Sequence, residues 1–200
     1  MDNYSSDAIE QMAQEMLRYS GALSIPVDLN RVMSALNVSL RYEPLEDHVS
    51  GALIAKPHEK HLIVNAKHHS NRQRFTIAHE LGHLRLHHQS GERLFIDTEL
   101  RIYQRVGQAG APQYSVPGST TTPQEEREAN MFAAALLMPA PFVQRAALEH
   151  NLWDEFDIAS LAHSFGVSEQ AMSIRLQQLR VVELVIAPQS IDAAHGSQFV

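Results

Sequence analysis

The segment RFTIAHELGHLRLHH contains His79, Glu80 and His83, two histidines and an acid whose spacing suits a metal site. Residues four apart lie on one face of a helix, so both imidazoles can reach a single ion, with Glu80 beside the remaining coordination position. Zinc held in this way lowers the pKa of a bound water to about 7, and a neighbouring carboxylate can then take its proton. We therefore expect His79 and His83 to be metal ligands and Glu80 to be the catalytic general base.

A third protein ligand must come from another part of the chain, because a hydrolytic zinc site has three. The chain has no cysteine, which excludes thiolate ligands. Gln89 stands where a longer form of the motif has a further histidine. A glutamate from a second helix is therefore the expected solution.

Three glutamates, Glu125, Glu126 and Glu128, stand at the start of an apolar segment that follows Thr122. Glu128 shares a helix face with Phe132, and a carboxylate on a buried face is costly unless a charge such as a metal ion pairs with it. Glu125 is expected to take part in a capping box. We therefore rank Glu128 first and Glu125 second as the third ligand, and expect the remaining acids of this turn to be solvated.

The elements that must position these residues are two helices. Ser70, with Gln73 as its capping partner, predicts a helix over about residues 71–88 that stops before Gly91. Gly82 inside it costs about 1 kcal/mol relative to alanine, so another element is expected to approach closely there.

The second helix is predicted over residues 123–137, because Thr122, Pro123 and Glu125 are an N-cap, a first-turn proline and a capping-box acid in order. Residues 107–122, rich in Gly, Pro, Ser and Thr, predict a long loop before it.

The rest of the chain predicts helices in the first forty residues and strands in the short apolar runs that follow. These strands are expected at residues 39–42, 51–56 and 61–65, with further helices near 141–150, 158–163 and 168–180, a last strand at 181–186 and a disordered tail at 188–200. We predict an α+β fold in which a small antiparallel or mixed sheet packs on the motif helix, with additional N- and C-terminal helices, as one domain over residues 1–187. Strand 51–56 or 61–65 could serve as an edge along which an extended substrate pairs, or both could equally be ordinary strands of the sheet.

Composition and charge narrow the class of protein. Of the 200 residues, 44% are hydrophobic, which is enough for one sizeable core, and the net charge of −7 argues against a chain that grips phosphate backbones. The amino terminus lacks the basic start and apolar stretch of a secretory signal, and no apolar run is long enough to span a membrane. We expect a cytoplasmic protein.

Five segments, in order, resemble the ImmA/IrrE family of bacterial metallopeptidases: PVDLNRVMSALNV, SGALI, HLIVN, RQRFTIAHELGHLRLHH and EREANMFAAALLMP. The resemblance covers roughly residues 8–180. It implies a zincin-like core, with His79 and His83 as zinc ligands, Glu80 as catalytic base, and a glutamate, aligned here with Glu128, as third ligand.

The resemblance also implies a function. Family members typically act on a partner transcriptional repressor, and others look like the toxin half of toxin–antitoxin pairs. The expected function is therefore a zinc-dependent endopeptidase that cleaves a partner transcriptional repressor, or acts as the toxin or regulator of a toxin–antitoxin or mobile-element system. The expected protein partner is a helix–turn–helix repressor or antitoxin. The alternative is a regulatory protein that sequesters such a partner without cutting it. Manganese or iron could replace zinc, because nitrogen and oxygen ligands alone do not decide the metal.

Residues 158–180 have the rhythm of a helix–turn–helix, in which Ser173, Arg175 and Gln177 would face DNA. Residues 150–186 carry two arginines against five acids, a balance that repels phosphates. We therefore favour helical packing or a protein docking face over a direct contact with nucleic acid.

Overall fold

The computed structural model describes residues 4–56, 58–87, 93–98 and 121–181. Its elements, in chain order, are α1 (Ser6–Ser20), α2 (Leu29–Ala35), β1 (Val38–Glu43), β2 (Val49–Ala55), β3 (Lys60–Asn65), α3 (Ser70–Leu86), β4 (Arg93–Thr98), α5 (Pro123–Leu137), α6 (Ala140–Ala147), α7 (Glu155–Phe165) and α8 (Glu169–Gln178). The α+β prediction is confirmed. In the described part of the chain, no helix combines the length and hydrophobicity that crossing a bilayer requires.

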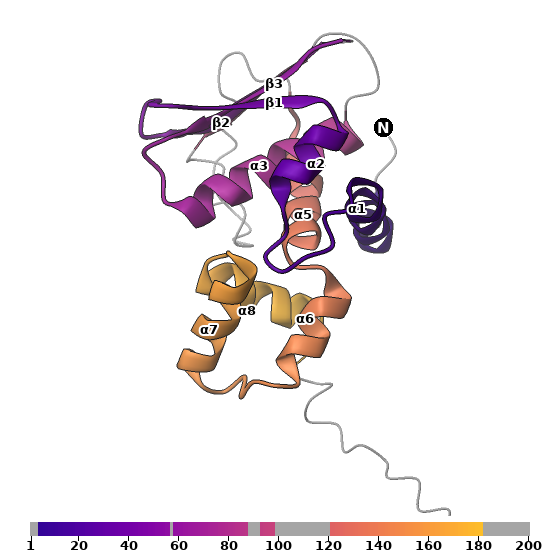
Figure 1. Ribbon diagram of the computed structural model, residues 1–200, viewed down its shortest axis with the longest axis vertical. Coiled ribbons are helices and arrows are strands. Elements are labelled where there is room, and N and C mark those ends of the chain that lie inside the picture. Colours follow the sequence, from indigo (N-terminus) through magenta and orange to yellow (C-terminus); the bar gives the residue numbers. More distant parts are fainter. Residues whose placement is uncertain (1–3, 57, 88–92, 99–120, 182–200) are drawn as a thin grey trace, which may run out of the picture.

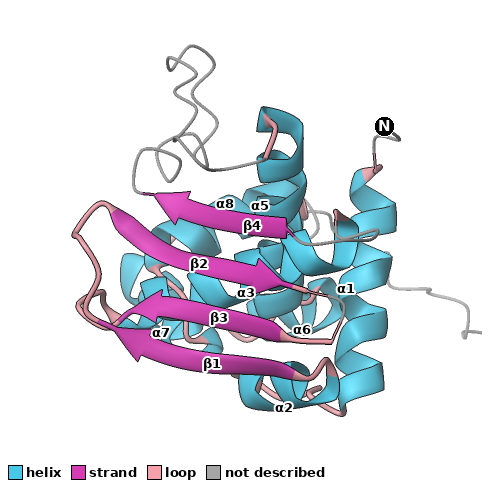
Figure 2. Cartoon of the chain, turned by 90° about the horizontal axis from the view of Figure 1, so that it is seen from above, coloured by secondary structure: helices cyan, strands magenta, loops and turns pink. Residues whose placement is uncertain are grey.

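The four strands form one sheet in the order β1-β3-β2-β4. β1 runs parallel to β3, whereas β2 is antiparallel to both β3 and β4, so the sheet is mixed. Figure 2 shows the sheet as one layer with the helices on one side of it. β2 and β3 lie inside the sheet, so of the two alternatives for these strands the structure shows ordinary sheet and not a free edge.

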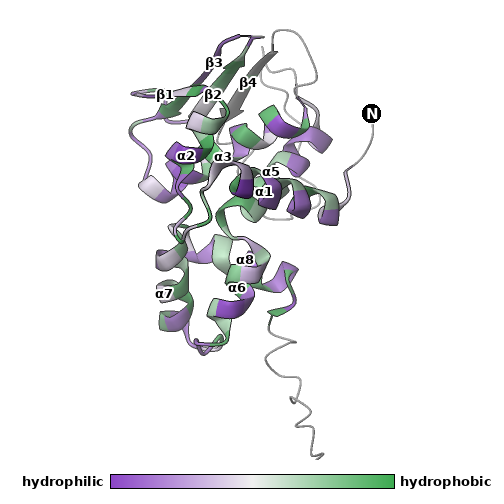
Figure 3. Ribbon diagram, turned by 45° about the vertical axis from the view of Figure 1, so that its right-hand side comes forward, coloured by the Kyte–Doolittle hydropathy of each residue, from purple (hydrophilic) through white to green (hydrophobic). Residues whose placement is uncertain are grey.

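The core lies between this sheet and the helices. α3 contacts β2 and β3 and packs most extensively against α5, which in turn packs against α1. α1 carries both hydrophobic and hydrophilic residues (Figure 3), and its apolar side chains Ile9, Ala13, Met16 and Leu17 are buried. Helices α6, α7 and α8 form a second layer on the side of α5 away from the sheet (Figure 1).

The close approach expected at Gly82 is present between α3 and α5. A Cβ atom on Gly82 would stand 3.1 Å from both Cα and the carbonyl oxygen of Ala129, and 3.3 Å from Cβ of Phe132. These contacts are tighter than most side chains accept, so glycine lets the backbones of the two helices meet at this point.

The second helix begins and ends where the sequence predicts. Thr122 Oγ1 accepts a hydrogen bond from the backbone N–H of Glu125, and Glu125 accepts one from the backbone N–H of Thr122. The prediction for α3 is correct in kind but shifted, because the N-cap is His69, whose Nδ1 accepts from the backbone N–H of Asn71, and the helix ends at Leu86. Ser70 is therefore the first helical residue and not the cap.

Other expectations fall partly or wholly outside the described residues. Gly91, most of the 107–122 loop, the last strand at 181–186 beyond its first residue, and the 188–200 tail are in this group. Strand β4 was not predicted from the sequence. It pairs with β2 in antiparallel register, from Thr98 opposite Val49 to Arg93 opposite Ala55.

Candidate metal centre

Helix α3 places the two motif histidines together in the interior. His79 and His83 have exposed fractions of 0% and 1%, and their Nε2 atoms lie 3.0 Å apart. The four-residue spacing on one helix face produces this approach, as the sequence predicts.

Helix α5 brings Glu126 to the same point. Its Oε2 lies 3.3 Å from Nε2 of His79, and its Oε1 lies 3.5 Å from Nε2 of His83. One ligand atom from each of these three residues can be chosen so that all lie within 4.8 Å of one another, and all three residues are buried. Within the described ranges, this is the group of histidine, aspartate and glutamate side chains that could hold a metal ion.

The structure does not bring Glu128, the first-ranked third ligand, to the two imidazoles. Glu128 Oε1 accepts hydrogen bonds from the backbone N–H of Tyr4 and from Nε2 of Gln124, and its Oε2 lies 3.7 Å from Nε2 of His87. Two positions separate Glu126 from Glu128, and two positions on an α-helix turn a side chain by more than half a circle. The two carboxylates therefore leave α5 in different directions.

The second-ranked residue, Glu125, is held in the capping box as expected. Its backbone carbonyl oxygen lies 3.1 Å from Nε2 of His87. His87, the C-cap of α3, is therefore buried beside the start of α5.

Glu126 was not predicted as a ligand from the sequence. All three glutamates of this turn are buried, so burial does not distinguish Glu126 from its neighbours. Glu125, Glu126 and Glu128 have exposed fractions of 6%, 7% and 3%, so the expectation of a solvated acidic turn is wrong for Glu126. Glu126 lies one turn before Asn130 and therefore on its face of α5, but the sequence alone does not show that this face turns toward His79.

Asn130 makes the next contact around the site. Its Oδ1 lies 2.9 Å from Nδ1 of His79. In the arrangement where Nδ1–H of His79 donates to this oxygen, the lone pair of Nε2 faces Glu126 and is available to a metal. The ring of His83 stacks on Phe95 of β4, with centroids 4.7 Å apart and planes at 20°. Helix α5 and the strand that the sequence did not predict therefore orient the two imidazoles.

The electrostatics favour the forms that bind metals. Burial lowers the pKa of His83 to about 4, and this outweighs the hydrogen bond to Glu126, which acts in the opposite direction. Burial raises the pKa of Glu126, but the hydrogen bonds and charges of His79 and His83 together outweigh it and keep that pKa well below its ordinary value. Near neutral pH, His83 is thus a neutral imidazole and Glu126 is an ionised carboxylate, as metal ligation requires.

Glu80 follows His79 in α3 and has an exposed fraction of 1%. The structure therefore places this carboxylate in the interior, next in sequence to one of the two histidines. A buried carboxylate is suited to proton transfer, because a dry environment strengthens its interaction with a proton donor.

The donor set of two imidazole nitrogens and one carboxylate is the ligand chemistry of hydrolytic zinc sites, which keep a further position for water. Its buried position and mutual distances fit one ion, so the residues present are compatible with zinc. No cysteine is available, and a softer metal that requires thiolates is therefore not favoured.

The helix–turn–helix-like segment folds as α7 and α8, but one of its predicted DNA-facing residues is buried. Arg175 has an exposed fraction of 4%, its Nη1 lies 2.5 Å from Oε1 of Glu10, and its Nε donates to the carbonyl oxygen of Met138. This side chain fixes α8 to α1 and α5. The interpretation of the segment as a packing element is supported by these contacts.

Comparison with known proteins agrees with this geometry. The model of peptidase family M78, described as the IrrE N-terminal-like domain, matches residues 33–177. Among solved structures, a Mycobacterium tuberculosis transcriptional regulator matches with a TM-score of 0.56 at 22% sequence identity, and this likeness shows the fold. The match covers 88% of this chain and 47% of that one, so the present chain spans about half of its length. No curated protein matches the sequence.

Proposed function

The chain belongs to peptidase family M78, the family of the IrrE N-terminal-like domain, and on this premise we propose that it is a zinc-dependent endopeptidase acting on another protein. The observation that carries the proposal is the buried group of His79, His83 and Glu126, with ligand atoms within 4.8 Å of one another. Family membership supplies the class of reaction, and this group supplies the place where it would occur.

In this proposal His79, His83 and Glu126 hold the ion. Bound zinc supplies a Lewis acid that lowers the pKa of water to about 7. Asn130 holds the His79 ring through Nδ1, and the stacked ring of Phe95 holds His83. Manganese or iron is the alternative ion, because the donor atoms alone accept all three.

Glu80 performs the proton transfers. Its carboxylate takes a proton from the water molecule as the water oxygen attacks the carbonyl carbon of the scissile peptide bond. The carbon–nitrogen bond then breaks, and Glu80 gives the proton to the departing amine, so the residue returns to its starting state. The water is consumed, and each fragment gains a new terminus.

The family resemblance also bears on the identity of the protein substrate. From the family resemblance, we infer that the substrate is a cytoplasmic repressor or antitoxin that contains a helix–turn–helix. The solved structure of similar fold is described as a transcriptional regulator, which is in keeping with a role in transcription. A protein that binds such a partner without cleaving it is the competing function, and the two differ in whether new termini are formed.

The deciding experiment compares the wild-type chain with Glu80→Gln, both loaded with zinc, on a proteome-derived peptide library. Mass spectrometry should find new termini with the wild type and none with the variant, because the amide cannot accept the proton. Metal content and unfolding midpoints of the two proteins should agree. Equal cleavage by Glu80→Gln, or no cleavage by either protein, would contradict the proposed mechanism.

A further inference from the structure

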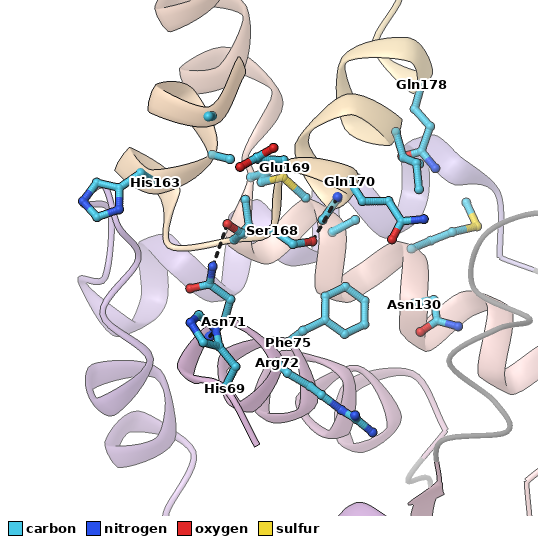
Figure 4. Close-up of a pocket in the computed structure, with 18 of the residues that line it drawn as sticks. His69, Asn71, Arg72, Phe75, Asn130, His163, Ser168, Glu169, Gln170 and Gln178 are labelled. Atoms are coloured by element: carbon cyan, nitrogen blue, oxygen red, sulfur yellow. Dashed lines mark hydrogen bonds between the residues drawn. The ribbon is translucent and has the colours of Figure 1, made fainter. Parts of the chain in front are cut away.

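A cavity lies between the metal-site helices and the α6–α8 layer (Figure 4). Its volume is about 1050 Å³, at the upper end of the range for small-molecule pockets, and its walls come from α3, α5, α7 and α8. Phe75 reaches from α3 into the space between the helices (Figure 4). Other apolar side chains in the wall are Met131, Ala134, Ala159, Ala171 and Ile174. We call this cavity the helical groove.

The helical groove adjoins the metal centre through one shared residue, Asn130. Asn130 lines the groove and also contacts Nδ1 of His79 through its side-chain oxygen. Phe75 lies one turn before His79 on α3, and Met131 is the residue after Asn130 on α5. A molecule seated in the groove therefore lies next to the ring of one proposed metal ligand.

The walls determine how a polypeptide can be recognised there. They are helices and helix ends, and no strand lines the groove, so it offers no strand edge for backbone pairing. An extended chain would leave its own backbone groups without partners against these apolar side chains. An amphipathic helix satisfies its backbone internally and presents an apolar face, and the Met131 and Met138 side chains adapt to such surfaces.

Charge further restricts the occupant. Two arginines, Arg72 and Arg127, line the groove, against one acidic residue, Glu169. Arg127 is exposed and stands one turn before Asn130, so a positive charge lies toward the metal centre. A carboxylate on the bound helix would be favoured at that end.

Side-chain hydrogen bonds hold the walls in place. Asn71 Nδ2 donates to the carbonyl oxygen of Val167, and Arg74 Nε donates to that of Gly166, so the turn between α7 and α8 is fixed to the start of α3. Arg175 fixes α8 to α5 through Met138. The groove is therefore largely formed before a partner arrives, which lowers the cost of binding.

We propose that the helical groove binds an amphipathic helix of the protein substrate, apolar face inward, with acidic side chains near Arg127. The substrate chain beyond the end of that helix then lies at the metal centre. This inference rests on the proposed function and deepens it, because it assigns the substrate a helical docking segment separate from the bond that is cut.

The test measures binding apart from cleavage, on the zinc-loaded Glu80→Gln protein. Three fluorescent peptides serve as probes: an amphipathic helix with glutamates on its polar face, a scrambled peptide of the same composition, and the amphipathic peptide with lysines for glutamates. Anisotropy should show the acidic amphipathic peptide binding at least about tenfold more tightly than either control peptide.

Variants locate the binding site. Ile174→Asp should weaken binding of the acidic amphipathic peptide about tenfold, and Arg127→Glu should weaken it while improving binding of the lysine peptide. Leu148→Asp is the matched control, because Leu148 is 67% exposed and does not line the groove. Unfolding curves identify any variant that fails to fold, and Ala171→Glu then replaces Ile174→Asp.

Equal binding of the amphipathic and scrambled peptides would overturn the inference, as would unchanged binding by a folded groove variant. Sedimentation that shows a dimer of the Glu80→Gln protein, abolished by Ile174→Asp, would assign the groove to a second copy of the chain and also overturn it. Loss of library cleavage in the wild type with retained peptide binding would instead refute the proposed function alone.

Discussion

The side-chain oxygen of Asn130 lies 2.9 Å from Nδ1 of His79, while Glu126, one turn earlier on α5, approaches Nε2 of the same ring. Both nitrogens of His79 therefore face side chains from one helix. Because α5 provides the side chains near both ring nitrogens, it can fix the tautomer and the orientation of the imidazole together.

Replacing Asn130 by alanine should weaken zinc binding about 10- to 100-fold, because the His79 ring loses the acceptor that orients it. Asn130→Asp keeps an oxygen acceptor and should retain most of the affinity. Competition with a chromophoric chelator measures both variants. Equal affinities for wild type and Asn130→Ala would show that the hydrogen bond has no orienting role.

Glu126→Gln should abolish stoichiometric zinc binding, because the amide removes the charge next to both imidazoles. Glu128→Gln should keep the metal, since that side chain faces Tyr4, Gln124 and His87. Elemental analysis after dialysis gives the metal content of each protein. The reverse outcome would restore Glu128 as the third ligand.

The metal-free protein should lose stability as the pH falls from about 6.5 toward 4. The pKa of His83 is about 4 in the folded chain against 6.5 for an ordinary histidine, so the unfolded chain binds the proton first. This contribution is complete above pH 6.5 and its loss amounts to as much as about 3 kcal/mol at pH 4. Urea unfolding with a chelator present measures it. His83→Gln should show a weaker pH dependence over the same interval, and an identical dependence would contradict the assignment to His83.

Gly82→Ala should destabilise the fold by about 1–2 kcal/mol, although alanine is the better helix former. The new Cβ would stand 3.1 Å from backbone atoms of Ala129, which cannot rotate away, so α3 and α5 must separate. The same movement draws Glu126 from the histidines and should weaken zinc binding. Denaturant unfolding and chelator competition test the two effects, and a variant more stable than the wild type would show that the helices have room to spare.

Arg175→Met should cost about 3 kcal/mol, because it leaves Glu10 without the partner that lies 2.5 Å away and removes the hydrogen bond to Met138. Gln177→Met on the exposed side of α8 is the control and should change stability by less than about 0.5 kcal/mol. Neither variant should alter retention on DNA. Salt-sensitive DNA binding by the wild type, lost in Gln177→Met, would reinstate a nucleic-acid contact for this segment.

The sequence was sufficient for those features that depend on neighbouring residues. Thr122 and Glu125 form a capping box within one turn, and His79 and His83 share a face within one helix. Gly82 also predicted a close contact with another helix. Glycine destabilises a helix interior, so its presence there indicates that a neighbouring element leaves no room for a side chain.

The choice among the three glutamates needed the tertiary structure. Helical periodicity tells which residues share a face of α5, but the face turned toward His79 and His83 is set by how α5 packs on α3. Strand β4 was missed for a similar reason, since its pairing with β2 joins residues far apart in the sequence. Long-range contacts of this kind leave little trace in a local pattern.

The ion pair between Glu10 and Arg175 joins α1 to α8, which lie near opposite ends of the described chain, and α1 also packs against α5. During synthesis, α1 and α3 leave the ribosome well before α5 and α8. Until the later helices emerge, the imidazoles of His79 and His83 lack the Glu126 carboxylate, and the side of α3 that packs against α5 is open to water. The metal site is consequently completed late in synthesis. A truncated product that stops before α5 would carry His79 and His83 without Glu126, the third residue of the group.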